Sequence, residues 1–213
     1  MNLESFPLQF ITNGATPDES ILQARQVLDG GCRWVQLRMK DASADVVRST
    51  AERLKVITDQ YDATLIIDDH VEVARDVRAS GVHLGKNDMH PSQARQILGK
   101  EFVIGGTCNT FDDVLRVKDF VDYIGCGPFR FTTTKKNLAP VLGLDGYRDL
   151  IWAMRSQGID TPVVAIGGIT VDDIRDVLQS GPNGIALSRE IIRADDPVLK
   201  TEQIVDAILH ARL

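Results

Sequence analysis

Two cations alternate with apolar residues in one short stretch of the chain, in the pattern of a surface that binds an anion. The stretch Val35–Lys40 places Gln36, Arg38 and Lys40 on one face of an extended strand, because successive strand side chains point to opposite faces. Buried cations are costly unless a negative charge meets them, so this row predicts contact with phosphate oxygens. An edge strand with a solvated polar face is the alternative.

Acidic residues follow the next two apolar runs. Asp68 and Asp69 end one run, and Asp88 comes shortly after the other. Mg²⁺ prefers one or two carboxylates together with substrate phosphate oxygens, so an aspartate from each run beside the cations indicates a magnesium site. Either aspartate taken singly could instead cap the helix that follows it.

The connection over residues 127–143 is long and carries hydroxyl groups and lysines, among them Thr132, Thr134 and Lys135. Hydroxyl donors and ammonium groups suit a pyrophosphate, and a connection of this length in a compact domain is usually functional. A solvated polar turn is the alternative, but Gly127-Pro128 and two aromatic residues ahead of the hydroxyls favour a shaped lid.

Glycine and serine follow the last two apolar runs. Gly167 and Gly168 follow one, and Leu187-Ser188 ends the other. Glycines let backbone N–H groups approach a phosphate, and the helix N-terminus that follows adds a positive dipole. The two ends together predict a second, separate phosphate site; a simple tight turn is the alternative for the glycine pair.

The chain offers no arrangement for covalent catalysis. It lacks a Gly-x-Ser-x-Gly elbow, and none of its four histidines has a partner at metal-ligand spacing. His83 is predicted to lie inside the fold with its hydrogen bonds satisfied. The residues therefore favour an enzyme that positions two phosphorylated substrates, one of them at a basic and metal-assisted diphosphate site.

Eight short apolar runs alternate with amphipathic segments, such as the one that carries Phe111, Val114 and Leu115. Parallel strands covered by helices have this pattern. The Gly-x-Gly-x-x-Gly turn of an open dinucleotide-binding sheet is absent after the first run, so we expect an α/β fold, a single-domain (β/α)₈ TIM barrel over residues 1–213. The predicted strands are Leu8–Thr12, Trp34–Arg38, Thr64–Ile67, Gly81–Leu84, Phe102–Gly105, Tyr123–Cys126, Val163–Ile166 and Gly184–Leu187.

Composition narrows the class of protein. With 24 Lys and Arg against 30 Asp and Glu, the net charge of −6 argues against nucleic-acid binding, which needs a basic face. Three widely spaced cysteines indicate reduced thiols rather than disulfides or a zinc site, and no apolar run is long enough to span a membrane. We expect a cytoplasmic protein with no membrane partner; a homo-oligomer stays open.

From Phe10 to about Ile192, the chain resembles the thiamine phosphate synthase family. The resemblance implies a transferase that joins hydroxymethylpyrimidine diphosphate to hydroxyethylthiazole phosphate and releases pyrophosphate with Mg²⁺. It also implies a dissociative route, in which a pyrimidinylmethyl cation forms and the thiazole nitrogen captures it. The matching segments are Val35–Lys40, Ile67–Asp69, Gly81–Asp88, Gly127–Lys136, Ile166–Thr170 and Gly184–Ser188.

The resemblance assigns a role to each candidate residue. Arg38, Lys40 and Lys135 would act on the diphosphate, and Asp69 and Asp88 would ligate Mg²⁺. The other substrate-binding residues it implies are Gln36 for the pyrimidine diphosphate, Thr132 and Thr134 for the pyrophosphate, and Gly168, Leu187 and Ser188 for the thiazole phosphate. Asp68 and Thr107 are also implied to bind substrate, with neither substrate specified.

Three positions depart from the family pattern. Asp68 stands where asparagine is usual and adds a carboxylate near the pyrimidine or the metal. Thr107 replaces a frequent serine and keeps its hydroxyl, and Arg189 stands where a small residue is common, adding a potential phosphate contact.

Two other functions fit the same fold. A related thiazole tautomerase would not need the diphosphate residues, which are all present here. A catalytically silent phosphate-binding regulator would bind its ligand without releasing pyrophosphate.

Overall fold

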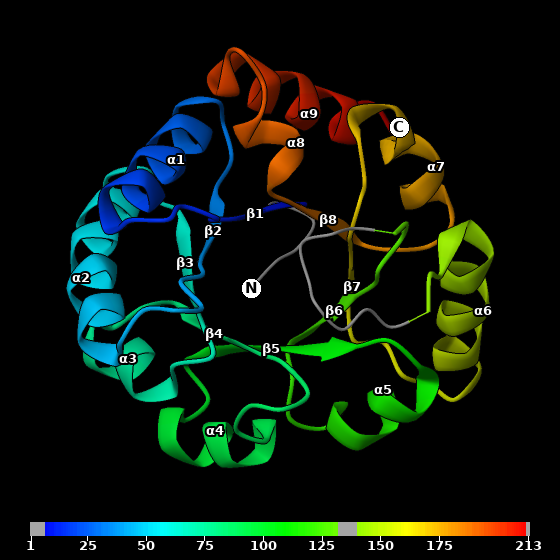
Figure 1. Cartoon of the computed structure of the whole chain (residues 1–213). Helices are drawn as coiled ribbons and strands as arrows, with labels where there is room; N and C mark the ends of the chain where they lie inside the picture. Colours follow the sequence, from blue (N-terminus) through cyan, green and yellow to red (C-terminus); the bar gives the residue numbers. More distant parts are fainter. Residues whose placement is uncertain (1–6, 132–139, 212–213) are drawn as a thin grey trace.

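The computed structural model describes residues 7–131 and 140–211 of the chain. Eight parallel strands follow one another around a closed barrel, and β8 returns to pair with β1 through Leu8 and Ile185 (Figure 1). The fold expected from the sequence is therefore confirmed. The strands are β1 (Leu8–Ile11), β2 (Trp34–Leu37), β3 (Thr64–Asp68), β4 (Gly81–Leu84), β5 (Val103–Cys108), β6 (Tyr123–Cys126), β7 (Val163–Ile166) and β8 (Gly184–Leu187).

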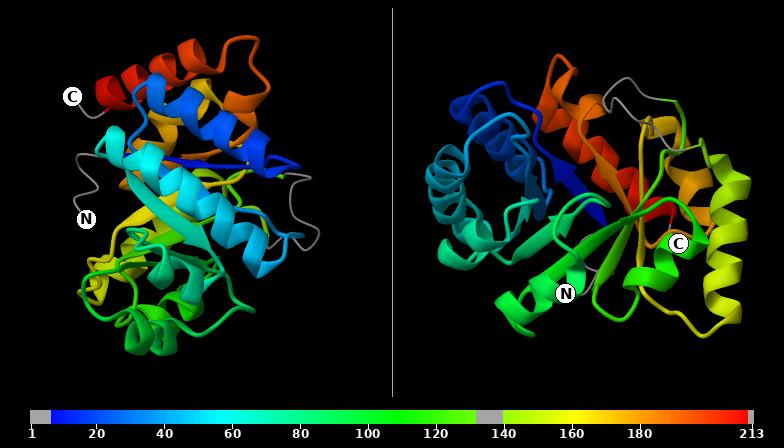
Figure 2. Two further views of the ribbon diagram at one scale, coloured as in Figure 1. Left: turned by 90° about the vertical axis from the view of Figure 1, so that its left-hand side faces the viewer. Right: turned by 60° about the horizontal axis from the view of Figure 1, so that its bottom comes forward.

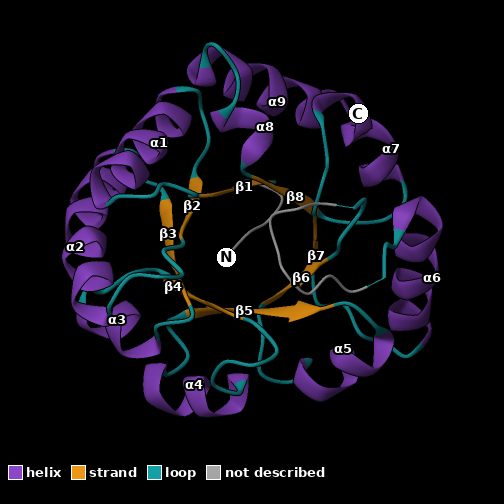
Figure 3. Cartoon of the chain, viewed as in Figure 1, coloured by secondary structure: helices purple, strands orange, loops and turns teal. Residues whose placement is uncertain are grey.

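Helices form an outer ring and run alongside the strands that they cover (Figures 2 and 3). The ring closes where α9 packs against α1 and α7. Its members are α1 (Pro17–Asp29), α2 (Ala44–Gln60), α3 (Val71–Asp76), α4 (Pro91–Leu98), α5 (Phe111–Val117), α6 (Gly143–Ser156), α7 (Ile174–Gln179), preceded by the 3₁₀ turn η1 (Val171–Asp173), and α9 (Pro197–Ala211); the short α8 (Arg189–Ile192) lies between β8 and α9.

Four of the eight strands have the bounds expected from the sequence, and the other four differ by a few residues. β1 ends one residue early and β2 stops before Arg38, whereas β3 extends through Asp68. β5 begins later and runs on to Cys108, which brings Thr107 inside the strand. These differences all concern strand ends at the rim, where hydrogen-bonding partners on neighbouring strands decide how far pairing extends.

Side chains from the strands divide between two apolar clusters. Val35, Leu37 and Ile67 face outward and belong to the large core between strands and helices. A smaller cluster fills the lumen with Trp34, Ile66, Tyr123, Val164 and Ala186. The lumen is therefore a packed core, as in other barrels of this class. Space for a substrate is therefore expected above this cluster, at the ends of the strands.

Local sequence signals explain where the first helices begin. Thr16 accepts a hydrogen bond from the backbone N–H of Glu19 and is followed by Pro17, a residue favoured in the first helical turn. Ser43 caps α2 by accepting from the backbone N–H of Val46. These caps begin each helix close to the end of the preceding strand and keep the connections short.

The three cysteines have free thiols, as expected. Within residues 7–131 and 140–211, no helix is both long and apolar enough to cross a membrane.

Candidate active site

The predicted alternation holds for Gln36, but β2 ends at Leu37, so Arg38 lies just beyond the strand and Lys40 lies in the turn that follows. Gln36 is buried in the lumen, and its Nε2 donates to Oδ1 of Asp68 at 2.5 Å. Nε of Arg38 lies 3.5 Å from the other oxygen of Asp68. Because β2 pairs with both β1 and β3, the alternative of a solvated edge strand is wrong.

The carboxylate of Asp68 thus bridges an amide and a guanidinium. A carboxylate can only accept hydrogen bonds, so it orients Nε2 of Gln36 toward itself and leaves Oε1 pointing away. That Oε1 is buried and has no partner among the described residues. A buried acceptor without a partner costs about 1–3 kcal/mol, so Gln36 is suited to meet a donor from a ligand.

Thr12, which the sequence did not single out, fixes the loop after β2. Its Oγ1 accepts a hydrogen bond of 2.9 Å from the backbone N–H of Arg38. Lys40 lies two residues farther on, exposed in a turn, and its charge reaches the Asp69 carboxylate. Both cations are therefore present at the barrel mouth.

The two proposed metal-ligating aspartates lie against each other. Burial, the charge of Asp68 and a direct contact with Asp88 raise the pKa of Asp69 to about 7, against the opposing effect of Lys40. Asp69 also has a φ of 63°, a left-handed conformation in which few residues other than glycine are found. Strain and like charge at one point indicate a functional site.

Neither aspartate caps a helix, so that alternative is wrong. His70 is the residue before α3, and His90 caps α4. Oδ2 of Asp88 instead accepts from the backbone N–H of Gly85 at 2.7 Å. A Cβ atom on Gly85 would lie 2.6 Å from that oxygen, so the glycine permits the carboxylate to fold back over β4.

This donor set fits Mg²⁺. Two carboxylates in contact repel each other until a cation neutralises them, and Mg²⁺ prefers one or two carboxylates with the remaining positions filled by water and phosphate. Within the described ranges no group of three or more potential metal-binding side chains is found. A site with two carboxylates that is completed by a phosphorylated substrate agrees with that finding.

A hydrogen-bonded chain of polar side chains crosses the lumen beside this site. Nε2 of Gln9 donates to the Tyr123 hydroxyl at 3.1 Å, and that hydroxyl lies 3.0 Å from Nδ1 of His83. Nε2 of His83 lies 3.0 Å from Oγ1 of Thr107. The expectation of a satisfied histidine inside the barrel is confirmed. Gln9 and Tyr123 were missed, although Gly105 and Gly125 on neighbouring strands hinted at a bulky lumenal group.

The glycine pair after β7 forms a strained turn. Gly167 and Gly168 have φ values of 103° and 72°. Arg130, from the segment after β6, donates through Nη1 to the carbonyl oxygen of Gly168 at 3.1 Å and forms a two-bond ion pair with Asp173. Arg130 therefore ties the glycine turn to Asp173 at the start of the next helical segment.

Ser188 follows β8, and its Oγ is buried without a partner among the described residues. The Leu187 side chain packs into the outer core, so only its backbone can contribute to a ligand site. Arg189 lines an open hollow of about 350 Å³ with Glu190, Arg193 and Lys200. The ends of β7 and β8 thus offer backbone groups and one hydroxyl, as the prediction of a second phosphate site requires.

Thr132, Thr134 and Lys135 lie outside the described residues, so their assignment to the pyrophosphate stays a prediction. The described part of the connection packs closely: Phe129 is buried and stacks on Tyr147 with ring centroids 6.3 Å apart. The start of this connection is therefore an integral part of the barrel.

Known proteins resemble this chain over nearly its whole length. A family model described as thiamine monophosphate synthase matches residues 8–191. A thiamine-phosphate synthase of Phocaeicola vulgatus is 55% identical over 97% of this chain and 100% of that protein. One from Bacteroides fragilis is 52% identical over 93% and 98%. The solved structure of thiamine phosphate pyrophosphorylase from Pyrococcus furiosus superposes with a TM-score of 0.86 at 32% identity, covering 99% of each chain.

These relatives are named for synthesis, so the comparisons give the tautomerase and regulator alternatives no support. The identities are high and the matches cover the lumenal strands, both aspartates and the glycine turn. The chain belongs to the thiamine monophosphate synthase family.

Proposed function

We propose that the chain joins 4-amino-2-methyl-5-hydroxymethylpyrimidine diphosphate to 4-methyl-5-(2-hydroxyethyl)thiazole phosphate, giving thiamine phosphate and pyrophosphate. One observation carries this proposal. Arg38, Lys40, Asp69 and Asp88 converge at one barrel mouth, opposite a separate turn suited to a monophosphate. Family membership makes the chain a transferase; the convergence explains how it can serve two phosphorylated substrates.

The diphosphate belongs at the ends of β2, β3 and β4. Arg38 is held by Asp68 and offers its remaining donors to phosphate oxygens, while Lys40 adds a second positive charge from the turn. Asp69 and Asp88 are the residues that would hold Mg²⁺, which supplies charge neutralisation of the departing diphosphate when bound. Lys135 would complete this set.

The pyrimidine ring belongs above the packed lumen. The buried Oε1 of Gln36 on β2 accepts from a ring substituent, and the hydroxyl of Thr107 on β5 provides a second polar contact. Heterocyclic amino groups and ring nitrogens are suited to such a pair of partners. Together they orient the exocyclic carbon for transfer.

The thiazole phosphate belongs at the ends of β7 and β8. The backbone at Gly168 and Leu187 and the hydroxyl of Ser188 donate to its oxygens, so the phosphate anchors the ring with its nitrogen facing the pyrimidine. The protein needs no covalent nucleophile. A dissociative transfer requires only that the two rings are aligned and the leaving charge is stabilised.

The direct test is pyrophosphate release by the purified chain. Mixing both substrates with Mg²⁺ should release one pyrophosphate for each thiamine phosphate formed. Omitting either substrate, or adding a chelator, should abolish release. Pyrophosphate formed without the thiazole phosphate would show hydrolysis instead, and no release under any condition would reject the proposal.

We also propose that residues 1–213 form one domain in a cytoplasmic protein. Pairing of β8 with β1 and packing of α9 on α1 join the two ends of the described chain into one unit. The three buried, free thiols agree with a reducing compartment.

A further inference from the structure

The lumen contains a polar chain that the proposed reaction does not by itself explain. Gln9, Tyr123, His83 and Thr107 come from β1, β6, β4 and β5 and are linked by three contacts of 3.1, 3.0 and 3.0 Å. Gln9 and Tyr123 are almost fully buried, whereas Thr107 is half-buried at the mouth. This series of hydrogen-bonded side chains therefore runs from the packed interior to Thr107 at the proposed substrate site.

Glycines on the neighbouring strands leave space for the rings of His83 and Tyr123. A Cβ atom on Gly105 would lie 2.5 Å from Nδ1 of His83, and one on Gly125 would lie 2.8 Å from its Cε1. The Trp34 ring packs edge-on against Tyr123, with ring centroids 4.9 Å apart. Glycines on two strands and an aromatic contact thus hold the phenol and the imidazole in one arrangement.

Counting the available protons shows in which direction each hydrogen bond of this series is donated. Gln9 donates to the phenol oxygen, so the single proton of Tyr123 is directed to Nδ1 of His83. A neutral imidazole that accepts at Nδ1 carries its proton on Nε2 and donates it to Oγ1 of Thr107. The Thr107 proton is then directed away from His83, toward the mouth. Burial keeps the phenol protonated, because it raises the pKa of Tyr123 well above its usual range.

We propose that Gln9, Tyr123 and His83 are positioning residues that make the Thr107 hydroxyl a hydrogen-bond donor to an acceptor atom of the pyrimidine diphosphate. This inference rests on the proposed function and extends it to the interior of the barrel. An aligned donor costs no reorganisation when the substrate binds, whereas a freely rotating hydroxyl must be ordered first. The effect acts through Thr107 alone.

The first test reads the tautomer of His83 in the free protein by ¹⁵N NMR of the imidazole nitrogens at neutral pH, with the signals assigned by their loss in His83→Gln. We expect a neutral ring with the proton on Nε2. A proton on Nδ1 alone would overturn the inference, because Nε2 would then accept the Thr107 proton. A charged ring would also overturn it, because both ring nitrogens would then donate and Tyr123 and Gln9 would no longer set the direction of the Thr107 hydroxyl. This test uses the unaltered chain and does not depend on activity.

The second test is a double-mutant cycle between Tyr123→Phe and Thr107→Val, with kcat and KM for the pyrimidine diphosphate as readouts. Tyr123→Phe should lower kcat/KM about three- to tenfold, the size expected for one hydrogen bond. In the Thr107→Val background the same change should cost less than about twofold, because the hydroxyl on which it acts is gone. Equal losses in both backgrounds would reject the inference.

Tyr147→Phe is the matched control. Tyr147 is also fully buried, and its hydroxyl donates to the carbonyl oxygen of Cys126 at 2.9 Å, outside the polar chain. Any effect of Tyr147→Phe should be the same in both backgrounds. Failure of the wild-type chain to release pyrophosphate would reject the proposed reaction without changing the tautomer result, so the two proposals fail separately.

Discussion

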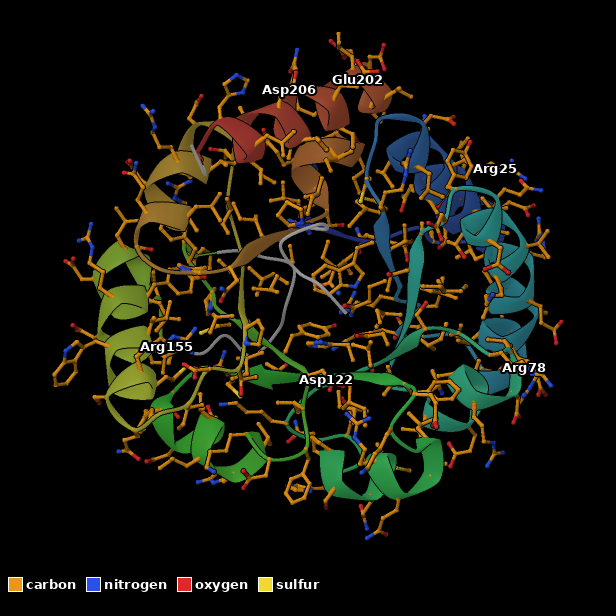
Figure 4. All side chains as sticks on the ribbon, turned by 180° about the vertical axis from the view of Figure 1, so that it is seen from behind. Arg25, Arg78, Asp122, Arg155, Glu202 and Asp206 are labelled. Atoms are coloured by element: carbon orange, nitrogen blue, oxygen red, sulfur yellow. The ribbon has the colours of Figure 1, made fainter. Side chains whose placement is uncertain are left out.

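The two ends of the barrel differ in whether their polar groups have hydrogen-bonding partners. At the end where the strands begin, Asp122 accepts from the backbone N–H of Ile104 at 2.7 Å and from Arg95 at 2.6 Å, and Figure 4 shows it at this end. There Ser80 and Asn183 likewise accept from the backbone N–H groups of Leu65 and Val163. Side chains at this end complete the hydrogen bonding of the strands.

At the end where the strands finish, polar groups are left in costly states. Asp69 contacts a second carboxyl and has a left-handed backbone, and the side-chain oxygens of Gln36 and Ser188 are buried without partners among the described residues. These costs are tolerated where a ligand relieves them. One end therefore maintains the fold, and the other keeps unsatisfied groups for substrates.

Asp88→Asn should have the largest effect on activity and tests this contrast most directly. We expect kcat/KM at fixed Mg²⁺ to fall about a hundredfold, because one charged ligand is lost from a site that stabilises a leaving group. Thermal stability should be unchanged or higher, since removal of one carboxylate relieves the repulsion at Asp69. Pyrophosphate release against Mg²⁺ concentration measures the first effect, and Asp119→Asn, on an exposed aspartate elsewhere, is the control.

The opposite end should respond in the opposite way. Asp122→Asn weakens an ion pair with Arg95 and a hydrogen bond to the backbone of β5, so we expect a loss of about 1–2 kcal/mol in the free energy of unfolding. The value of kcat should stay within about twofold of the wild type, the scatter expected of a distant substitution. Urea unfolding and steady-state kinetics of the same preparation decide this; a large loss of kcat with unchanged stability would contradict it.

Ser188→Ala separates the two phosphate sites. Its buried hydroxyl has no partner to lose among the described residues, so the variant should be as stable as the wild type. We expect KM for the thiazole phosphate to rise about three- to tenfold, with KM for the pyrimidine diphosphate unchanged. A similar rise in both KM values would show that Ser188 acts on the whole mouth.

The smallest effect is expected for Asp173→Asn. Partial burial pushes the pKa of Asp173 upward, but hydrogen bonds from Arg130 and Thr170 outweigh it and hold that pKa below its ordinary value. The carboxylate therefore stabilises the fold above the ordinary pKa of aspartate, and this contribution disappears as the pH falls through the folded-state pKa.

Because Arg130 is half exposed, the loss in Asp173→Asn should be less than about 1 kcal/mol at neutral pH. The difference in unfolding free energy between variant and wild type should shrink below about pH 4, where unfolded aspartate begins to take up protons. A difference that is constant with pH would assign the effect to packing instead.

Much of this protein was determined by local sequence. Eight apolar runs with helices between them predicted the barrel, because short buried strands and amphipathic helices have different periodicities. Alternation along Val35–Lys40 predicted that Gln36 shares a face with the cations, and Gln36 is indeed buried in the lumen below Arg38. Residues at strand ends were good candidates for the site because all parallel strands finish at the same edge.

Only the tertiary structure decided how these groups meet. No sequence pattern shows that Asp68 joins Gln36 to Arg38, or that the phenol of Tyr123 reaches His83 from two strands away. The position of a residue along its strand fixes the face to which its side chain points. Which side chains it meets on other strands depends on the register between strands and on the closure of the barrel. Contacts across the lumen therefore arise from the closed sheet as a whole, and local patterns cannot encode them.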